Sequence, residues 1–120
     1  MLLIKAEAEL KTTGSADALI TLNQLRAKRA ISGKNNLLSG TVTLNTILDE
    51  RAIELCGEQQ RWFDLKRTRT LVDRVKAYNA QAPANVKDIH YLRPIPQAQI
   101  DAVTNKSTTV GVGFWQNEGY

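Results

Sequence analysis

Hydrophobic residues recur at helical spacing near the start of the chain. Leu3, Ala6 and Leu10 would line one face of a helix over residues 2–11, with charged side chains between them. Gly14 follows at a position where the helix can end, because glycine adopts a left-handed conformation without steric cost. The sequence offers no capping residue before this helix, so we expect the chain to be cut from a longer protein.

A second helical pattern follows after a very short turn. Ser15 is expected to cap this helix, Asp17 lies in its first turn, and Gly33 lies just past its end. Its apolar stripe consists of Ala18, Leu22 and Leu25. Two helices joined by such a short turn form an antiparallel pair, which is the unit of tetratricopeptide-like arrays.

Three shorter helices are predicted after a loop over residues 32–42. Thr43 is expected to cap a helix that Gly57 breaks, because glycine costs about 1 kcal/mol in a helix interior. A short helix over residues 61–67 follows. The apolar positions of the third and fifth helices are Leu44, Ile47, Leu48 and Leu55, and Leu71, Val72, Val75 and Tyr78. Residues 1–80 are therefore predicted to be mainly helical.

The character of the sequence changes after residue 80. Residues 80–92 resemble an extended loop, and Pro94 and Pro96 exclude a regular helix through them, so a single helical turn would begin at Pro96 or Gln97. The segment over 107–120 is expected to be irregular, with its aromatic side chains Phe114, Trp115 and Tyr120 held against the helices. The predicted fold is one all-α domain over residues 1–120, with tetratricopeptide-like helix pairs and an irregular Pro- and Gly-containing tail over residues 81–120.

Composition and charge exclude several classes of protein. The 120 residues are 42% hydrophobic and 23% charged, which is typical of a globular protein rather than a disordered one. The net charge of +4 is spread along the chain, and only Lys66, Arg67 and Arg69 come near to a basic stripe, so nucleic-acid binding is not predicted. No apolar stretch approaches the roughly 20 residues of a membrane-spanning helix. The first ten residues are not a signal peptide, because charged side chains interrupt the apolar core that such a peptide needs.

Acidic, basic and aromatic residues gather around the run GEQQRWFDLKR over residues 57–67. If the preceding helix persists, Glu50, Glu54 and Glu58 share one face, with Arg51 and Arg61 as the nearest cations. Two carboxylates can carry out glycoside hydrolysis, but groups on one helix face do not bracket a sugar. Ion pairs that brace neighbouring helices, with aromatic rings beside them, are the favoured interpretation. This structural cluster comprises Glu50, Arg51, Glu54, Glu58, Arg61, Trp62, Phe63 and Asp64.

The remaining candidate sites are weaker. His90 has no nearby pattern of a triad or metal site and is expected to be a hydrogen-bonded loop residue. Cys56 is the single cysteine, which excludes an intrachain disulfide and a cysteine metal cluster, and it is expected to be buried. The Gly111–Gly113 turn lacks the spacing of a dinucleotide loop. Trp115 and Tyr120 could form a sugar platform, although anchoring of the tail is favoured. No cofactor or metal is predicted.

Several segments together resemble the C-terminal part of the SusD/RagB family. LIKAEAEL and ALITLNQLRAKRA resemble the family's helix pair, and ILDERAIELCGEQQRWFDLKR resembles its acid-Arg-acid helix followed by an Arg-Trp-Phe-Asp-Leu turn. HYLRPIPQAQID and the closing QNEGY resemble its terminal signature, with Glu118 where the family usually has proline. Each segment alone is weak, but five in the right order are specific.

The resemblance implies a fragment of a larger SusD-like fold that is not an enzyme. Family members bind glycans or other nutrients at the bacterial outer membrane, as lids on a TonB-dependent, SusC-like transporter. They are lipid-anchored through an N-terminal region that this chain would lack, and most ligand contacts would lie outside it. The expected partners are therefore that transporter and an oligosaccharide or polysaccharide ligand.

Two alternatives and one consequence stay open from the sequence. A helical-repeat module that binds a protein partner is the alternative to nutrient binding, and a small hydrolase that uses Glu50 and Glu54 is the third possibility. In a fragment, the first helix pair would expose a face made for a neighbouring repeat. We expect Leu3, Leu10, Leu22 and Leu25 to form that face, and the isolated chain either to self-associate or to be marginally stable.

Overall fold

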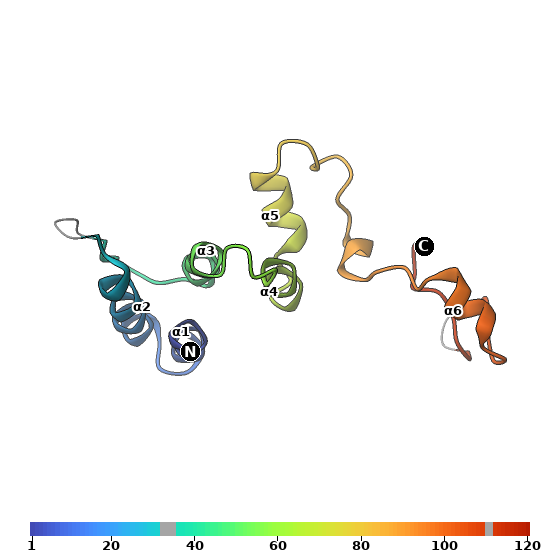
Figure 1. Cartoon of the computed structure of the whole chain (residues 1–120), viewed down its shortest axis with the longest axis horizontal. Coiled ribbons are helices and arrows are strands. Elements are labelled where there is room, and N and C mark those ends of the chain that lie inside the picture. Colours follow the sequence, from blue (N-terminus) through green and yellow to red (C-terminus); the bar gives the residue numbers. More distant parts are fainter. Residues whose placement is uncertain (32–35, 110–111) are drawn as a thin grey trace. The chain divides into compact units, whose positions relative to one another are not determined.

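The computed structural model describes residues 1–31, 36–109 and 112–120, so the predicted helix end at Gly33 and part of the Gly111–Gly113 turn lie outside the described residues. The described residues are all-α, as predicted, and the only strand-like pairing among them is an isolated bridge between Lys106 and Phe114. The helices are α1 (Leu2–Thr12), α2 (Ser15–Arg29), α3 (Leu44–Glu54), α4 (Arg61–Arg67), α5 (Leu71–Tyr78), the 3-10 helix η1 (Asp88–Tyr91) and α6 (Gln97–Ala102), as shown in Figure 1.

The chain divides into two compact units, Met1–Arg61 and Trp62–Tyr120. In the first unit, α1 packs against both α2 and α3 (Figure 1). The predicted stripe of α2 is buried in the core that these helices share. That core consists of Leu3, Ala6, Ala18, Leu22, Leu25, Val42 and Ile47. The predicted helix pair is thus confirmed, and a third helix completes its core.

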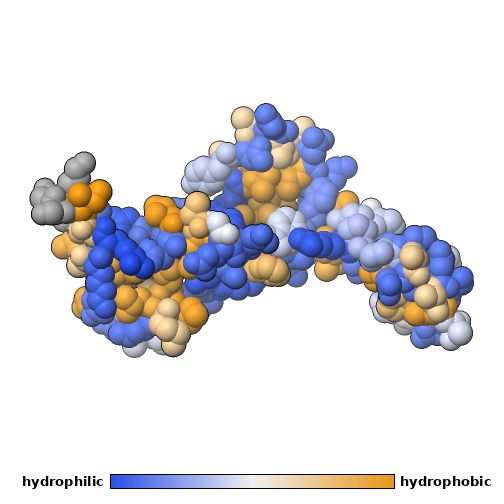
Figure 2. Space-filling view, in the orientation of Figure 1, coloured by the Kyte–Doolittle hydropathy of each residue, from blue (hydrophilic) through white to orange (hydrophobic). Residues whose placement is uncertain are grey.

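The expectation that the helix pair exposes an apolar face is wrong, because the leucines of that face are covered. Leu3, Leu22 and Leu25 are buried and Leu10 packs against the core, so none of them forms a free surface. The large apolar residues that stay exposed on this unit include Ile4, Ile20, Ile31 and Ile53. Apolar surface therefore lies among charged residues, as the space-filling view also shows (Figure 2). The error arose because a helical pattern defines an apolar face but not which partner covers it.

Polar side chains of α2 hold the other segments of the first unit in place. Thr21 is buried, and its hydroxyl donates a hydrogen bond of 2.6 Å to Glu9 Oε2 on α1. The Asn23 amide donates to the Leu38 carbonyl at 3.1 Å and accepts from the Leu38 N–H at 2.8 Å. Such paired bonds satisfy the loop backbone, which would otherwise be left without partners as it passes over the helix.

Ser15 does not cap α2 as predicted. The capping position is Gly14, with φ of +112°, and no side chain accepts from the first turn. The Ser15 hydroxyl instead accepts a hydrogen bond of 2.7 Å from the Val42 N–H. A loop distant in sequence therefore uses the oxygen that a local rule assigned to the helix end.

The ends of α3 follow the sequence closely. Thr43 and Thr46 form a reciprocal capping box at its start, as the predicted cap requires. The helix ends at Glu54, and Gly57 adopts φ of +85°, so the predicted break is confirmed. Cys56, in the turn that follows, is exposed, which contradicts the expectation that it is buried. The turn ends the helical face on which Cys56 would have been covered.

The second unit contains α4 except for its first residue, together with α5, η1 and α6. The predicted short helices are found at α4, α5 and α6, but η1 was not predicted and lies in what was expected to be extended loop. At its start, the His90 Nδ1 atom accepts a hydrogen bond of 2.9 Å from the Lys87 N–H, so His90 is the hydrogen-bonded loop residue that was predicted. The buried apolar residues of this unit are Leu65, Leu71, Val72 and Ile100.

Two amide side chains and one tyrosine hydroxyl attach the C-terminal segment. The Gln116 amide accepts from the Ile95 N–H at 2.7 Å and donates to the Ile95 carbonyl at 2.9 Å. The Asn117 amide donates to the Arg93 carbonyl at 2.6 Å. Tyr120 is exposed, but its hydroxyl donates to the Leu92 carbonyl at 3.1 Å. The segment is thus held mainly against the stretch around residues 92–95. Its end also meets Ile89 of η1, where the Tyr120 hydroxyl lies 3.5 Å from the Ile89 carbonyl, so the expected contact with the helices is found for Tyr120.

Candidate functional site

The buried acid of the predicted structural cluster is paired across two helices. The Arg26 Nε atom donates a hydrogen bond of 3.0 Å to Glu50 Oε2, and its Nη2 atom donates a second, very short bond to Glu50 Oε1. Glu50 is only 8% exposed, and the same guanidinium also donates to the Asn36 carbonyl at 2.8 Å. This hydrogen bonding to Glu50 raises the pKa of Arg26. The two-pronged geometry fixes the position of α3 on α2.

A matching pair lies further along the same two helices and is exposed. The Arg29 Nε atom lies 2.9 Å from Glu54 Oε1 and 3.2 Å from Glu54 Oε2. These hydrogen bonds from Arg29 lower the pKa of Glu54 and raise that of Arg29. The acids of α3 therefore pair with arginines of α2. The sequence had predicted Arg51 and Arg61 as their partners.

The two acids line one shallow hollow. It has a volume of about 270 Å³ and is lined by Leu25, Arg26, Arg29, Asn36, Glu50, Ile53 and Glu54. A general acid of a glycosidase needs a raised pKa so that it holds a proton near neutral pH. The pKa of Glu54 is shifted in the opposite direction, and Glu50 accepts both bonds of a guanidinium. Both acids of this hollow are thus ion-paired with arginines of α2.

The lowered pKa of Glu54 makes a testable prediction about pH. Because the folded-state pKa lies below the ordinary value of 4.5, the stabilisation from this pair is present above that value and is lost as the pH falls through the folded-state pKa. We expect a carbon-detected NMR titration to place the Glu54 midpoint below 4.5, and Arg29→Gln to raise it. Lys28→Gln, which removes an exposed charge from the same turn, is the control and should leave the midpoint unchanged. An unshifted midpoint in the parent chain would contradict the pairing.

The other members of the cluster in the first unit have different surroundings. Arg61 Nη1 donates a hydrogen bond of 2.6 Å to the Leu48 carbonyl near the middle of α3. Glu58 lies beyond the end of α3 and is exposed, so the predicted row of three acids on one helix face is wrong. Arg51 is half-buried on α3.

Arg61→Ala should destabilise the chain. A hydrogen bond from a charged donor contributes about 1.5–3 kcal/mol, and its loss leaves the Leu48 carbonyl with one partner fewer. We expect the free energy of unfolding to fall by at least about 1.5 kcal/mol, measured by urea denaturation followed by circular dichroism. Gln60→Ala, at the exposed neighbouring residue, is the control. Equal stability of the two variants would show that Arg61 does not brace α3.

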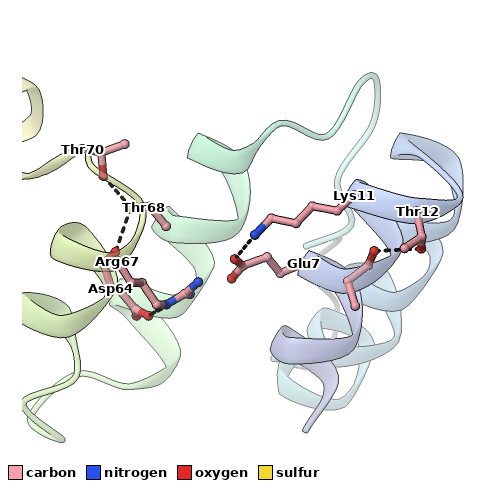
Figure 3. A network of polar contacts seen from close by, with 8 residues as sticks. Glu7, Lys11, Thr12, Asp64, Arg67, Thr68 and Thr70 are labelled. Atoms are coloured by element: carbon pink, nitrogen blue, oxygen red, sulfur yellow. Dashed lines mark hydrogen bonds and ion pairs between the residues drawn. The ribbon is translucent and has the colours of Figure 1, made fainter.

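In the second unit, α4 holds the remaining cluster residues. Asp64 is buried and accepts hydrogen bonds from Arg67 at 2.9 and 3.1 Å, as the close-up view shows (Figure 3). Trp62 is half-buried, with the Lys66 Nζ atom 5.6 Å from its ring centre. Phe63 is 64% exposed, which contradicts the expectation that it fills a groove. The expected aromatic packing is therefore wrong for Phe63, and the Trp62 ring is only partly covered.

The aromatic residues of the C-terminal segment border a second hollow. Its volume is about 460 Å³, and Trp115, Tyr120 and the intervening residues line it together with Gln97, Ile100, Ser107 and Thr108. The amides of Gln116 and Asn117 are already bonded to backbone atoms, as described above. Anchoring by Tyr120 follows from its hydroxyl bond to Leu92, whereas a sugar-binding role for Trp115 stays an untested alternative.

Within residues 1–31, 36–109 and 112–120, no group of three His, Cys, Asp or Glu side chains is placed to hold a metal ion. Over the same residues, no helix is both long and apolar enough to cross a bilayer.

Arg26 and Arg29 are the residues that sequence reasoning missed. Nearness along the chain points to Arg51 and Arg61 as partners of the acids and leaves out the arginines of the preceding helix. A signal was present, because two arginines three residues apart on α2 match two acids four residues apart on α3. Only the fold, in which α2 and α3 both pack against α1, brings these separate patterns together as pairs.

Comparison with known proteins identifies the family. The profile of the SusD family matches residues 1–120. The chain is 34% identical over 110 residues to SusD-like protein P2 of Formosa agariphila. The matched region covers 83% of this chain and 22% of that protein. It is 36% identical over 81 residues to SusD-like protein P38 of the same organism, and this matched region covers 61% of the chain and 16% of that protein. No solved structure gives a significant match.

The chain therefore spans less than a quarter of the length of these two relatives. The family profile nevertheless extends over the whole chain, including the helix pair, the cluster around α3 and α4, and the C-terminal segment. The chain belongs to the SusD family.

Proposed function

We propose that this chain is the scaffold part of a non-catalytic receptor that binds glycans as nutrients at the outer surface of a bacterium. The observation that carries the proposal is the match of the SusD family over residues 1–120. In this role the receptor is lipid-anchored at the outer membrane and passes its ligand to a TonB-dependent transporter of the SusC type.

The geometry of the first unit supports a scaffold. The buried Glu50 is held by Arg26 and the half-buried Glu54 by Arg29. Arg61 is bonded to the backbone of α3. Groups engaged in this way set the angle between helices and are not available to a substrate. We infer that Glu50, Glu54 and Arg61 of the structural cluster brace the helices, while other parts of the receptor contact most of the ligand.

Purification from the native bacterium tests the receptor proposal. A tagged copy of the encoding gene is expressed from its own locus, and outer membranes are extracted with mild detergent. We expect the tagged protein to be accessible to protease on intact cells and to co-purify with a TonB-dependent transporter. Recovery from the cytosol without a transporter would contradict the proposal and would favour a helical-repeat module with a different protein partner.

A chromogenic assay separates binding from hydrolysis. Incubation with aryl glycosides should release no colour above that of a heat-denatured sample. If colour is released and disappears in Glu54→Gln but not in the exposed control Glu58→Gln, the chain is a hydrolase and the proposed function fails.

A further inference from the structure

We propose that the second unit carries a binding site for acidic glycans, formed by Lys66, Arg69 and Arg93 around the rings of Trp62 and Tyr91. We call these five residues the cation–aromatic cluster. The inference rests on the proposed nutrient-binding function, to which it adds a location and a chemical class of ligand.

Each cation of the cluster lies over an aromatic ring. The Arg93 Cζ atom is 5.2 Å and the Lys66 Nζ atom 5.6 Å from the centre of the Trp62 ring, so two cations share one indole. The Arg69 Cζ atom is 5.0 Å from the centre of the Tyr91 ring. All three distances are within the range of about 6 Å in which a ring quadrupole attracts a cation.

Backbone and hydroxyl contacts join the two rings into one cluster. The Arg69 N–H donates to the Lys66 carbonyl at 3.1 Å, which ties the end of α4 to the turn that follows. Arg69 adopts φ of +56°, a conformation that a side chain rarely takes without support. The Tyr91 hydroxyl accepts from the Val72 N–H at 3.4 Å, and Arg93 follows Tyr91 by two residues. Residues 62–72 and 91–93 thus meet in one place.

The cluster keeps its positive charge, unlike the arginines of the first unit. Arg26 and Arg29 each face a carboxylate, whereas none of the three cations of the cluster lies within ion-pair distance of an acid in the part of the chain that the structure describes. An aromatic face holds a cation in place but does not neutralise it and leaves its N–H donors open. Residues 62–120 also contain eight basic and five acidic residues, so the wider charge does not cancel the cluster.

An acidic glycan matches this arrangement. Sulfate and carboxylate groups are the natural partners of guanidinium forks, and Arg69 and Arg93 are exposed to solvent. Because the rings already restrain the cations, binding costs less side-chain entropy than it would for free surface bases. A nucleic acid would present phosphate to the same groups, but the proposed nutrient-binding function favours a polysaccharide. The open cations then select sulfate or uronate substituents on it.

Calorimetry on the 120-residue chain tests the site. Dextran sulfate is the acidic probe and unsulfated dextran the neutral one, at about 50 mM salt so that screening stays moderate. We expect the chain to bind dextran sulfate and the double variant Arg69→Gln/Arg93→Gln to weaken that binding about ten-fold. A ten-fold loss corresponds to about 1.4 kcal/mol, to which each of the two exposed charges contributes a part. The matched control Lys28→Gln/Lys76→Gln removes the same charge from exposed positions outside the cluster and should change the affinity less than about two-fold.

A third variant and two competitors complete the design. Arg69→Lys/Arg93→Lys retains the charges and should retain most of the binding, which separates loss of charge from loss of fold. An equal loss in the glutamine variant and the control, or no binding of dextran sulfate, would overturn the site. Tighter binding of duplex DNA than of dextran sulfate would overturn it in favour of a nucleic acid. Binding of unsulfated dextran that no variant alters would overturn the acidic site alone and leave the proposed nutrient-binding function intact.

Discussion

Arg26→Ala should lower the stability of the first unit by about 3 kcal/mol. The substitution leaves Glu50 buried without its guanidinium partner, and breaking one side of a buried ion pair costs about 3–5 kcal/mol. The lower end of that range applies because the Arg26 side chain keeps 27% of its surface exposed. The hydrogen bond to the Asn36 carbonyl is lost at the same time.

The measurement should report on the first unit separately, because the chain divides into two. Native-state hydrogen exchange at the amides of α2 gives the free energy of opening of that unit. Arg29→Ala is the matched control, since it removes the same group from an exposed pair between the same two helices. Arg26→Ala/Glu50→Ala should be less destabilised than the sum of its single variants, because no buried charge is left alone. If Arg26→Ala and Arg29→Ala lower stability equally, the buried pair is not the brace that we describe.

Leu22→Ala is the second substitution with a large expected effect. Leu22 is fully buried where α2 meets the core of the first unit, and its truncation removes apolar contacts and leaves a cavity. Leucine-to-alanine substitutions in a core cost about 2–5 kcal/mol, and we expect about 3 kcal/mol here because a three-helix core has few neighbours that can move into the space.

A residue on the same helix supplies the control. Ile20 is 59% exposed, so Ile20→Ala should change the free energy of unfolding by no more than about 0.5 kcal/mol. Both variants are measured by hydrogen exchange at the amides of α1, which lie outside the substituted helix. An equal effect of the two would mean that α2 is not packed as the structure shows, and the core of the helix pair would have to be placed elsewhere.

The Arg26–Glu50 and Arg29–Glu54 ion pairs of the first unit differ in their burial, and therefore in how they respond to pH and to the loss of one partner. The Arg29–Glu54 pair is exposed and depends on pH through the lowered pKa of Glu54, whereas the Arg26–Glu50 pair has a buried acid that is costly to leave unpaired. The cation–aromatic cluster of the second unit is a third arrangement, in which rings restrain the cations without neutralising them. The same residue type therefore serves as a brace in one unit and as a proposed ligand-binding group in the other.

Local rules were sufficient for most element boundaries. The pattern of apolar residues located α1 and α2, Thr43 marked the start of α3, and Gly57 marked its break. These features depend on spacing and on the conformational preferences of single residues, so they can be read without knowledge of neighbouring helices. The series of family motifs was likewise visible in the sequence, and the profile over residues 1–120 confirms it.

Partners distant in sequence were decided only by tertiary packing. Ser15 was predicted to cap a helix but bonds to Val42, and the acids of α3 pair with arginines of α2 rather than with their sequence neighbours. Phe63 and Cys56 lie on the outside although both residue types favour the interior. A periodic pattern states which side chains share a face, but the energy of an ion pair or a buried ring depends on the group that the folded chain brings opposite it. For that physical reason the sequence determined the helices and the family, and the tertiary structure decided which charges are neutralised and which stay open to a ligand.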